Sequence, residues 1–240
     1  MLCPLLTVSK ILCVIPARAG SKRLPRKNKL QLDDKPLISW TIELAKKAFA
    51  ADEILVSTDD PEILEIALDL GLEVPWLRPK WLSGDSTSSV EVTLHALDWY
   101  ECEYSNVDGV MLLQPTSPFR KLATINAAID AFQIDSRHSI VSVTKVECHP
   151  SRMFSIIDNY LVSENLDADF NSPSQALDPI YAPNGLVYLT EVEKLRRTKS
   201  FFAGSIKPLI IEDPVENIDI DTRFDFEMAA LIAAAQRLNV

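Results

Sequence analysis

The stretch ILCVIP, residues 11–16, runs directly into ARAGSKRLPRKN, residues 17–28, and this pair of segments decides the fold class. The first segment is a short apolar, β-branched run that ends at a proline, which is typical of a buried strand. The second is a basic loop whose small residues allow backbone N–H groups to approach an anion closely. In open α/β sheets, ligands bind beyond the carboxyl ends of the strands. The two segments therefore predict an α/β protein with a binding site at this loop.

Strand and helix patterns alternate along the chain beyond this first strand. Apolar runs typical of strands recur at 54–57, 109–113, 139–144, 186–189 and 206–211. Helical spacing or helix-start signals occur at 37–50, 62–70, about 88–100, 121–132 and 222–238. Repeated strand–helix units imply right-handed crossovers and a largely parallel sheet with helices on both faces. We expect one α/β domain over residues 1–240.

Residues 146–183 break this rhythm, because they contain four prolines and irregular polar stretches without a clear amphipathic helix. We expect them to form an insertion outside the main sheet. A wider segment, approximately 146–205, carries apolar residues with no evident place on the sheet: Met153, Phe154, Ile156, Ile157, Phe201 and Phe202. An exposed apolar surface of that size usually marks an interface between proteins.

Composition excludes several classes of protein. The chain has 240 residues, 47% hydrophobic and 24% charged, so it is long enough to bury a core and too apolar to be disordered. No segment approaches the roughly 18 unbroken apolar residues of a membrane span, and we expect no signal peptide. Four scattered cysteines without a CxxC pair argue against a disulfide framework, and the three histidines lack zinc-ligand spacing. We therefore expect a cytoplasmic protein.

Charge is unevenly distributed. The net charge is −10, yet the segment 18–29 contains six lysines and arginines and no acid. The acidic remainder argues against a general nucleic-acid binder. The basic segment predicts a pocket for a small, highly charged anion, with a solvated basic loop as the alternative. It matches neither the GxxxxGK[ST] phosphate loop nor the GxGxxG dinucleotide motif.

The segment IPARAGSKRLPRKN at 15–28 resembles the opening motif of the acylneuraminate cytidylyltransferases, which make CMP-activated nonulosonic acids from CTP. Further motifs of that family follow in the same order: VSTDD at 56–60, LRP at 77–79, GDSTSS at 84–89, LLQPTSPFR at 112–120, HPSR at 149–152, PNGLVY at 183–188 and NIDIDT at 217–222. The resemblance covers nearly the whole chain. It implies a Rossmann-like three-layer nucleotidyltransferase sandwich with a small insertion that pairs two subunits, so that each completes the other's sugar site.

The resemblance also assigns the nucleotide half of the site. It places Arg18, Lys22 and Lys27 on the triphosphate, with Ser21 and Asn28 beside them, Arg78, Thr87 and Ser89 around the cytosine, and Gln114 at the ribose and the sugar acid. Arg18 and Lys22 would stabilise charge on the departing pyrophosphate. From the residues alone, Arg78 fits an ordinary surface arginine equally well, and Ser89 fits a helix N-cap.

Asp219 and Asp221 in NIDIDT form a second group. Residues two apart on an extended segment point the same way, so both carboxylates can meet one hard cation, here Mg²⁺. One of the two, with Asp221 as the candidate, would help deprotonate the attacking hydroxyl. The alternative is the end of a half-buried polar strand, which shows the same alternation.

The sugar half of the site is implied by matches at Arg152, Tyr188, Phe201 and Phe202, although a phenylalanine pair is more often plain core or interface. Bacterial sialic acid-using members of the family tend to have arginines where this chain has Ser174 and Ala182. Legionaminic and pseudaminic acid are therefore serious rivals of N-acetylneuraminate. The alternatives to a homodimeric nonulosonate enzyme are a cytidylyltransferase for an eight-carbon acid such as Kdo and a non-catalytic nucleotide-binding subunit.

Overall fold

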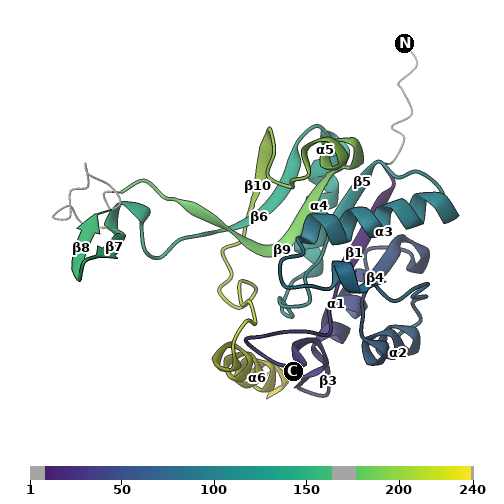
Figure 1. The fold of residues 1–240 in the computed structure, drawn as a ribbon, viewed down its shortest axis with the longest axis horizontal. Helices are drawn as coiled ribbons and strands as arrows, with labels where there is room; N and C mark the ends of the chain where they lie inside the picture. Colours follow the sequence, from purple (N-terminus) through teal and green to yellow (C-terminus); the bar gives the residue numbers. More distant parts are fainter. Residues whose placement is uncertain (1–8, 164–176, 239–240) are drawn as a thin grey trace, which may run out of the picture.

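The computed structural model describes residues 9–163 and 177–238, and its centre is a six-stranded sheet in the order β10-β6-β9-β5-β1-β4 (Figure 1). The strands are β1 Ile11–Pro16, β4 Ile54–Ser57, β5 Gly109–Leu112, β6 Ser139–Lys145, β9 Tyr181–Glu191 and β10 Ile206–Ile210. β1 pairs in parallel with β4 and β5, and β10 pairs in parallel with β6. β9 is antiparallel to both of its neighbours. The expected α/β fold with a largely parallel sheet is confirmed.

Helices cover both faces of the sheet, as the alternation of buried residues along β1 requires. Ile11, Cys13 and Ile15 pack with α1 Leu37–Ala45, α2 Pro61–Asp69 and α4 Leu122–Ile134. Leu12 and Val14 pack on the opposite face with α3 Ser89–Glu103 and with α5 Val192–Thr198. Successive strand residues point to opposite faces, so a strand buried on both sides is apolar throughout. The result is the three-layer sandwich that the sequence predicted.

Local signals set several helix boundaries. Asp60 accepts a hydrogen bond from the Glu62 backbone N–H and is followed by proline, which starts α2. At α3 the side chain of Ser88 accepts from the backbone N–H of Glu91, and the Glu91 carboxylate accepts from the backbone N–H of Ser88. Ser88 is therefore the N-cap, and Ser89 is the first helical residue. The first predicted helix, 37–50, ends earlier than expected, at Ala45.

A third core ties the C-terminal helix to the basic loop. α6 Arg223–Leu238 packs against the hairpin of β2 Gln31–Leu32 and β3 Lys35–Pro36, close to the short helix η1 Lys27–Lys29. Its buried residues include Leu24 of the basic loop, Phe119 of the loop after β5 and Ile220 of the NIDIDT segment. Because three motifs contribute to one small core, their polar residues are held close together.

The insertion stands away from the sandwich (Figure 1). β7 Phe154–Ile157 and β8 Tyr160–Ser163 form an antiparallel two-stranded sheet of their own, after the short helix η4 Pro150–Arg152. Its apolar side chains are open to solvent, with Ile156 74% and Leu161 69% exposed. Within the approximate segment 146–205, however, β9 is a central strand of the main sheet and α5 packs on its face. In the described residues, no helix has the length and apolarity to cross a membrane.

Candidate active site

A cleft of about 280 Å³, called here the central cleft, lies at the carboxyl ends of β1, β4 and β5. Its walls come from the basic loop after β1, from residues 84–92 and from the loop after β5. Seven of the residues named from the motifs line it: Arg18, Lys27, Asn28, Arg78, Thr87, Ser89 and Gln114. The carboxyl edge of a parallel sheet is the usual ligand position in α/β folds. The fold therefore gathers four separate motifs around one cavity.

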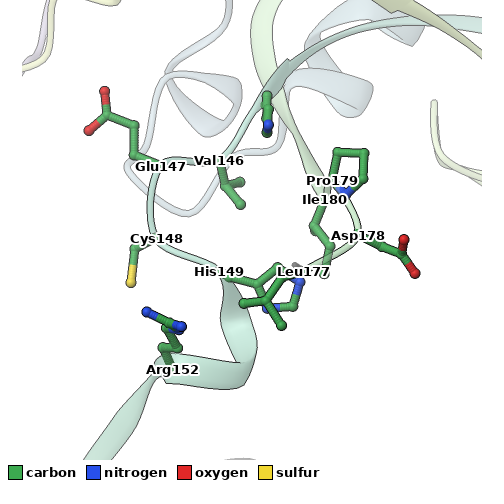
Figure 2. Close-up of a pocket in the computed structure, with 10 residues that line it drawn as sticks. Val146, Glu147, Cys148, His149, Arg152, Leu177, Asp178, Pro179 and Ile180 are labelled. Atoms are coloured by element: carbon green, nitrogen blue, oxygen red, sulfur yellow. The ribbon is translucent and has the colours of Figure 1, made fainter. Parts of the chain in front are cut away.

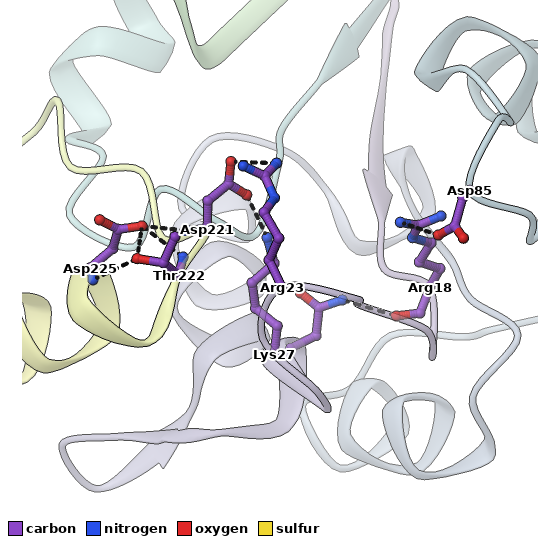
Figure 3. Close-up of polar contacts among 8 residues, drawn as sticks. Arg18, Arg23, Lys27, Asp85, Asp221, Thr222 and Asp225 are labelled. Atoms are coloured by element: carbon purple, nitrogen blue, oxygen red, sulfur yellow. Dashed lines mark hydrogen bonds and ion pairs between the residues drawn. The ribbon is translucent and has the colours of Figure 1, made fainter.

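Asp85 pairs with two cations of the basic loop, and Figure 3 shows one of them, Arg18. Its carboxylate forms ion pairs with Arg18 at 3.0 Å and with Lys22 at 2.6 Å, and Arg18 also donates to the Gly84 carbonyl at 3.0 Å. Lys22 lowers the pKa of Asp85, and Arg18 adds to the effect. The Lys22 side chain is 79% exposed, and ion pairs in such a position contribute little to stability. A polyanion can therefore replace Asp85 at little cost in stability.

Asp221 plays the same part on the other side of the basic loop. Its carboxylate pairs with Lys27 at 3.0 Å and with Arg23 at 2.9 Å (Figure 3). Asn28 is buried and donates its side-chain amide to the Arg18 carbonyl at 3.2 Å, which fixes the loop backbone. Ser21, next to Lys22, is half-buried. The basic loop thus presents cations that are already balanced by carboxylates from two distant segments.

Asp219 lies beside this group. It is open to solvent, yet the surrounding protein displaces enough water to raise its pKa, and Asp221 raises it further. The Thr116 hydroxyl donates to the Asp219 carboxylate and opposes the shift, while the Thr116 carbonyl accepts from the Ile220 backbone at 2.8 Å. Ile220 is fully buried, so the expected alternation is present although the structure has no strand there.

The two aspartates fit a magnesium ion by their donor chemistry. Mg²⁺ is usually bound by one or two carboxylates together with substrate phosphates and water. The described residues contain no group of three or more His, Cys, Asp or Glu side chains that could hold a metal by itself. Asp219 and Asp221, near Lys27 of the cleft, match the two-carboxylate arrangement.

Arg78 is buried at the end of β4, so the interpretation as an ordinary surface arginine is wrong. Its side chain donates to the hydroxyl of Ser57 at 3.0 Å and to the Ser57 carbonyl, and its backbone N–H donates to Thr58 at 2.6 Å. Burial lowers its pKa to about 10, which leaves it charged at neutral pH. Thr87 is half-buried and Ser89 is exposed, and both line the same cleft as Arg78.

Gln114 and Tyr188 come from neighbouring strands. Gln114 follows β5, and Tyr188 on β9 is paired with Leu112 of β5. A Cβ atom at Gly185 would lie 3.7 Å from the Gln114 amide, and φ at this glycine is +78°. The rings of Tyr188 and Phe202 are 5.3 Å apart, and Phe202 is 48% exposed.

Phe201 and Arg152 have different surroundings. Phe201 is only 2% exposed within the α3–α5 core, so little of it can meet a ligand. Arg152 lines a second cavity, of about 500 Å³, at the base of the insertion, with Cys148, His149 and Leu177 (Figure 2). In the part of the chain that the structure describes, this cavity and the central cleft share no lining residue. One chain therefore does not bring Arg152 to the cleft.

The structure adds residues that sequence reasoning missed. Asp85 stands inside the GDSTSS motif, where its charge was the available signal, and Arg23 stands in the basic run. Lys29 pairs with Asp60 at 2.7 Å and with Glu62 at 2.9 Å, and this anchors the loop to α2. Nothing in the local sequence indicates which acid each cation meets.

Known proteins are similar to this chain in sequence and in fold. A family model described as cytidylyltransferase matches residues 12–168. The CMP-N,N'-diacetyllegionaminic acid synthase of Legionella pneumophila is 40% identical over 91% of this chain and 94% of its own length. The N-acylneuraminate cytidylyltransferase of Escherichia coli is 36% identical over 93% of this chain, which spans only 52% of that relative. A solved CMP:2-keto-3-deoxy-manno-octonic acid synthetase complexed with CTP has a TM-score of 0.68 over 95% of this chain and 100% of that one; at 19% identity it supports the fold alone.

Proposed function

Because the chain belongs to the cytidylyltransferase family, we propose that it transfers CMP from CTP to a nonulosonic acid and releases pyrophosphate. The observation that carries this proposal is the central cleft, which Arg18 and Lys27 line, together with the pairing of Lys27 with Asp221, close to Asp219. The cations suit a triphosphate, and the carboxylates suit the metal ion that accompanies it.

In the proposed reaction the anomeric hydroxyl of the sugar acid attacks the α-phosphate of CTP. An O–P bond forms, the bond from the α-phosphate to the pyrophosphate oxygen breaks, and Asp221 is the candidate acceptor of the hydroxyl proton. Arg18 and Lys22 exchange Asp85 for the triphosphate, and Lys27 turns from Asp221 to a phosphate oxygen. These cations then stabilise charge on the leaving pyrophosphate, which is usually the largest contribution to such catalysis.

Mg²⁺ is the proposed cofactor, and Asp219 and Asp221 would hold it. When bound, such an ion neutralises charge on the phosphates and helps to orient them for displacement. Asp221 is paired with Lys27 and Arg23, and once these cations turn to the phosphates its carboxylate would be available to the metal ion.

The remaining cleft residues are proposed to recognise the nucleoside and the acid. Arg78, Thr87 and Ser89 would surround the cytosine, and Gln114 would contact the ribose and the sugar acid. Tyr188 and Phe202 would offer an aromatic surface for an acyl-amino group, and the buried Phe201 ring would hold Tyr188 in place by packing against it. Ala182 is half-buried on β9 and brings no charge, and Ser174 lies outside the described residues. A legionaminic-type acid is therefore the first substrate to test.

The active form is proposed to be a homodimer with shared sugar sites. The exposed apolar side chains of β7 and β8 support an interface, and Arg152 at the base of the insertion would reach the partner's site. A cytoplasmic location stays a prediction.

Pyrophosphate release from CTP, measured with a panel of acids, tests the function. We expect turnover with legionaminate, pseudaminate or N-acetylneuraminate derivatives and a dependence on Mg²⁺. Preference for Kdo would favour the eight-carbon alternative. Binding of CTP without turnover on any acid would favour a non-catalytic subunit.

A further inference from the structure

Arg120 is a buried cation between the two halves of the site. It ends the LLQPTSPFR motif and is 4% exposed. Its Nε donates to the Leu186 carbonyl at 2.7 Å, its Nη2 donates to the Gln114 carbonyl at 2.7 Å, and its Nη1 is 3.5 Å from the Thr41 hydroxyl. All three of these partners are neutral. Over residues 9–163 and 177–238, no carboxylate forms an ion pair with this guanidinium.

A buried guanidinium with only neutral partners lowers the stability of the fold. Burial lowers the pKa of Arg120 to about 10, so the side chain is still protonated at neutral pH, and Glu216 and Asp219 oppose the shift from a distance. A buried charge without a direct counter-ion is destabilising, and an apolar side chain of similar volume often suits such a position better. Residues that lower stability in this way are expected mainly at functional sites.

The position of the two carbonyls explains what the arginine does. The antiparallel pairing of β5 and β9 runs from Gly109–Glu191 to Leu112–Tyr188 and ends there. Continued by two residues, the same register would place Gln114 opposite Leu186. At that point the strands no longer pair, and the guanidinium bridges the two carbonyls instead. Arg120 thus replaces the sheet hydrogen bonds where β5 and β9 separate.

Each bridged residue belongs to a different half of the site. Gln114 lines the central cleft. Leu186 lies on β9 between Gly185 and Tyr188, and Gly185 is close to the Gln114 amide. We propose that Arg120 is a positioning residue that holds the nucleotide half and the sugar half of the site in register, without touching either substrate. This inference rests on the proposed function, because register matters only if two substrates react across the bridge.

Two substitutions test the bridge. Arg120→Lys keeps the charge but loses the planar guanidinium, which reaches the two carbonyls through separate nitrogens in a fixed geometry. Arg120→Gln removes the buried charge, so the cost of burying that charge is absent from this variant. Since misplacement of reactants by about 1 Å costs about 10²-fold in rate, we expect kcat to fall by that order in both variants. The dissociation constant of CTP, measured by calorimetry without the acid, should change by less than about threefold.

Phe132→Leu is the matched control. Phe132 is fully buried on α4 in the core below the sheet, so this substitution lowers Tm without touching the bridge, and its kcat should stay near that of the unmodified protein. A loss of kcat below tenfold in either folded Arg120 variant overturns the proposal, as does an equal loss in the control.

Amide hydrogen exchange separates this inference from the proposed function. We expect faster exchange at residues 114–120 and 184–188 in the Arg120 variants and no such change in Phe132→Leu. If the unmodified protein turns over no acid, the proposed function fails, and unchanged exchange in these two segments then overturns the bridge independently.

Discussion

The central cleft and the β7–β8 hairpin differ in how their side chains are satisfied within the chain. In the cleft, Arg18 and Lys27 already have carboxylate partners from the same chain. In the hairpin, Ile156 and Tyr160 are 74% and 75% exposed and have no such cover in the described structure. The charges of the cleft are therefore balanced within one chain, whereas the apolar side chains of the hairpin are left exposed by the described residues.

The energies of the two regions differ accordingly. The pairs of Asp85 are exposed, so exchanging this carboxylate for phosphate should cost the fold little. The Lys27–Asp221 pair is partly buried, with the Lys27 side chain 13% exposed, so its exchange depends on phosphate taking the place of the carboxylate. Apolar area contributes about 25 cal/mol for each Å² removed from water, so covering the hairpin favours association. The cleft therefore suits an exchange of ions, whereas the proposed role of the hairpin is burial against a partner.

The largest effect is expected at Lys22. Lys22→Ala should reduce kcat by about 10²–10³-fold, the loss typical of removing one group that stabilises the transition state. Its side chain is 79% exposed, so Tm should not change. Lys47→Ala, at an exposed lysine beyond the end of α1, is the control. Near-normal kinetics of Lys22→Ala in the pyrophosphate assay would remove this residue from the mechanism.

Asp219→Asn should reduce the apparent affinity for Mg²⁺ by at least about 10–100-fold, because an amide is a poorer ligand for a hard cation. The raised pKa of Asp219 means that its ionisation destabilises the fold, and this cost is absent below the ordinary pKa of aspartate and grows as pH rises through the raised value. Tm at pH 7 should therefore rise slightly, and the gain should vanish in acid. Thermal melts across pH and a Mg²⁺ titration check both effects; an unchanged titration, or full activity in EDTA, contradicts the metal site.

A charge on the hairpin should break the assembly while leaving the subunit folded. Ile156→Asp is expected to shift the protein to monomers in sedimentation and to reduce activity roughly tenfold at assay concentrations. Asn159→Asp adds the same charge at the turn, where φ is +66° and aspartate is tolerated, and it should leave both properties unchanged. Fully active monomers would refute the shared site.

The smallest effect is expected from mixing two inactive variants. An Arg152→Ala subunit refolded together with a Lys22→Ala subunit should recover about a quarter of normal activity, because half of the random dimers are mixed and each mixed dimer has one intact site. Each variant refolded alone is the control. Absence of recovery in proven mixed dimers would place Arg152 outside the partner's site.

Much of the fold could be predicted from the sequence because the signals are local. The apolar run of β1, the Asp60 cap of α2 and the Ser88 region at α3 each depend on a few adjacent residues. The motifs that line the cleft were found for the same reason, since each is contiguous. The length of β9 was underestimated, because Tyr181–Pro183 are exposed or half-buried residues that become a strand only by pairing with β6.

By itself, the sequence determined the α/β class, the six strands of the main sheet, five of the helices and the loop that follows β1. It did not predict α5 or the short strand pairs β2–β3 and β7–β8. The tertiary structure alone decided which partners the charged side chains meet: Lys27 pairs with Asp221, 194 residues away, and Arg120 donates to the Leu186 carbonyl, 66 residues away. It also buried Phe201 and left Phe202 exposed, although the two are adjacent. Local patterns follow from backbone geometry and burial on one element, whereas the partners of a charged side chain follow from how segments distant in the chain pack together.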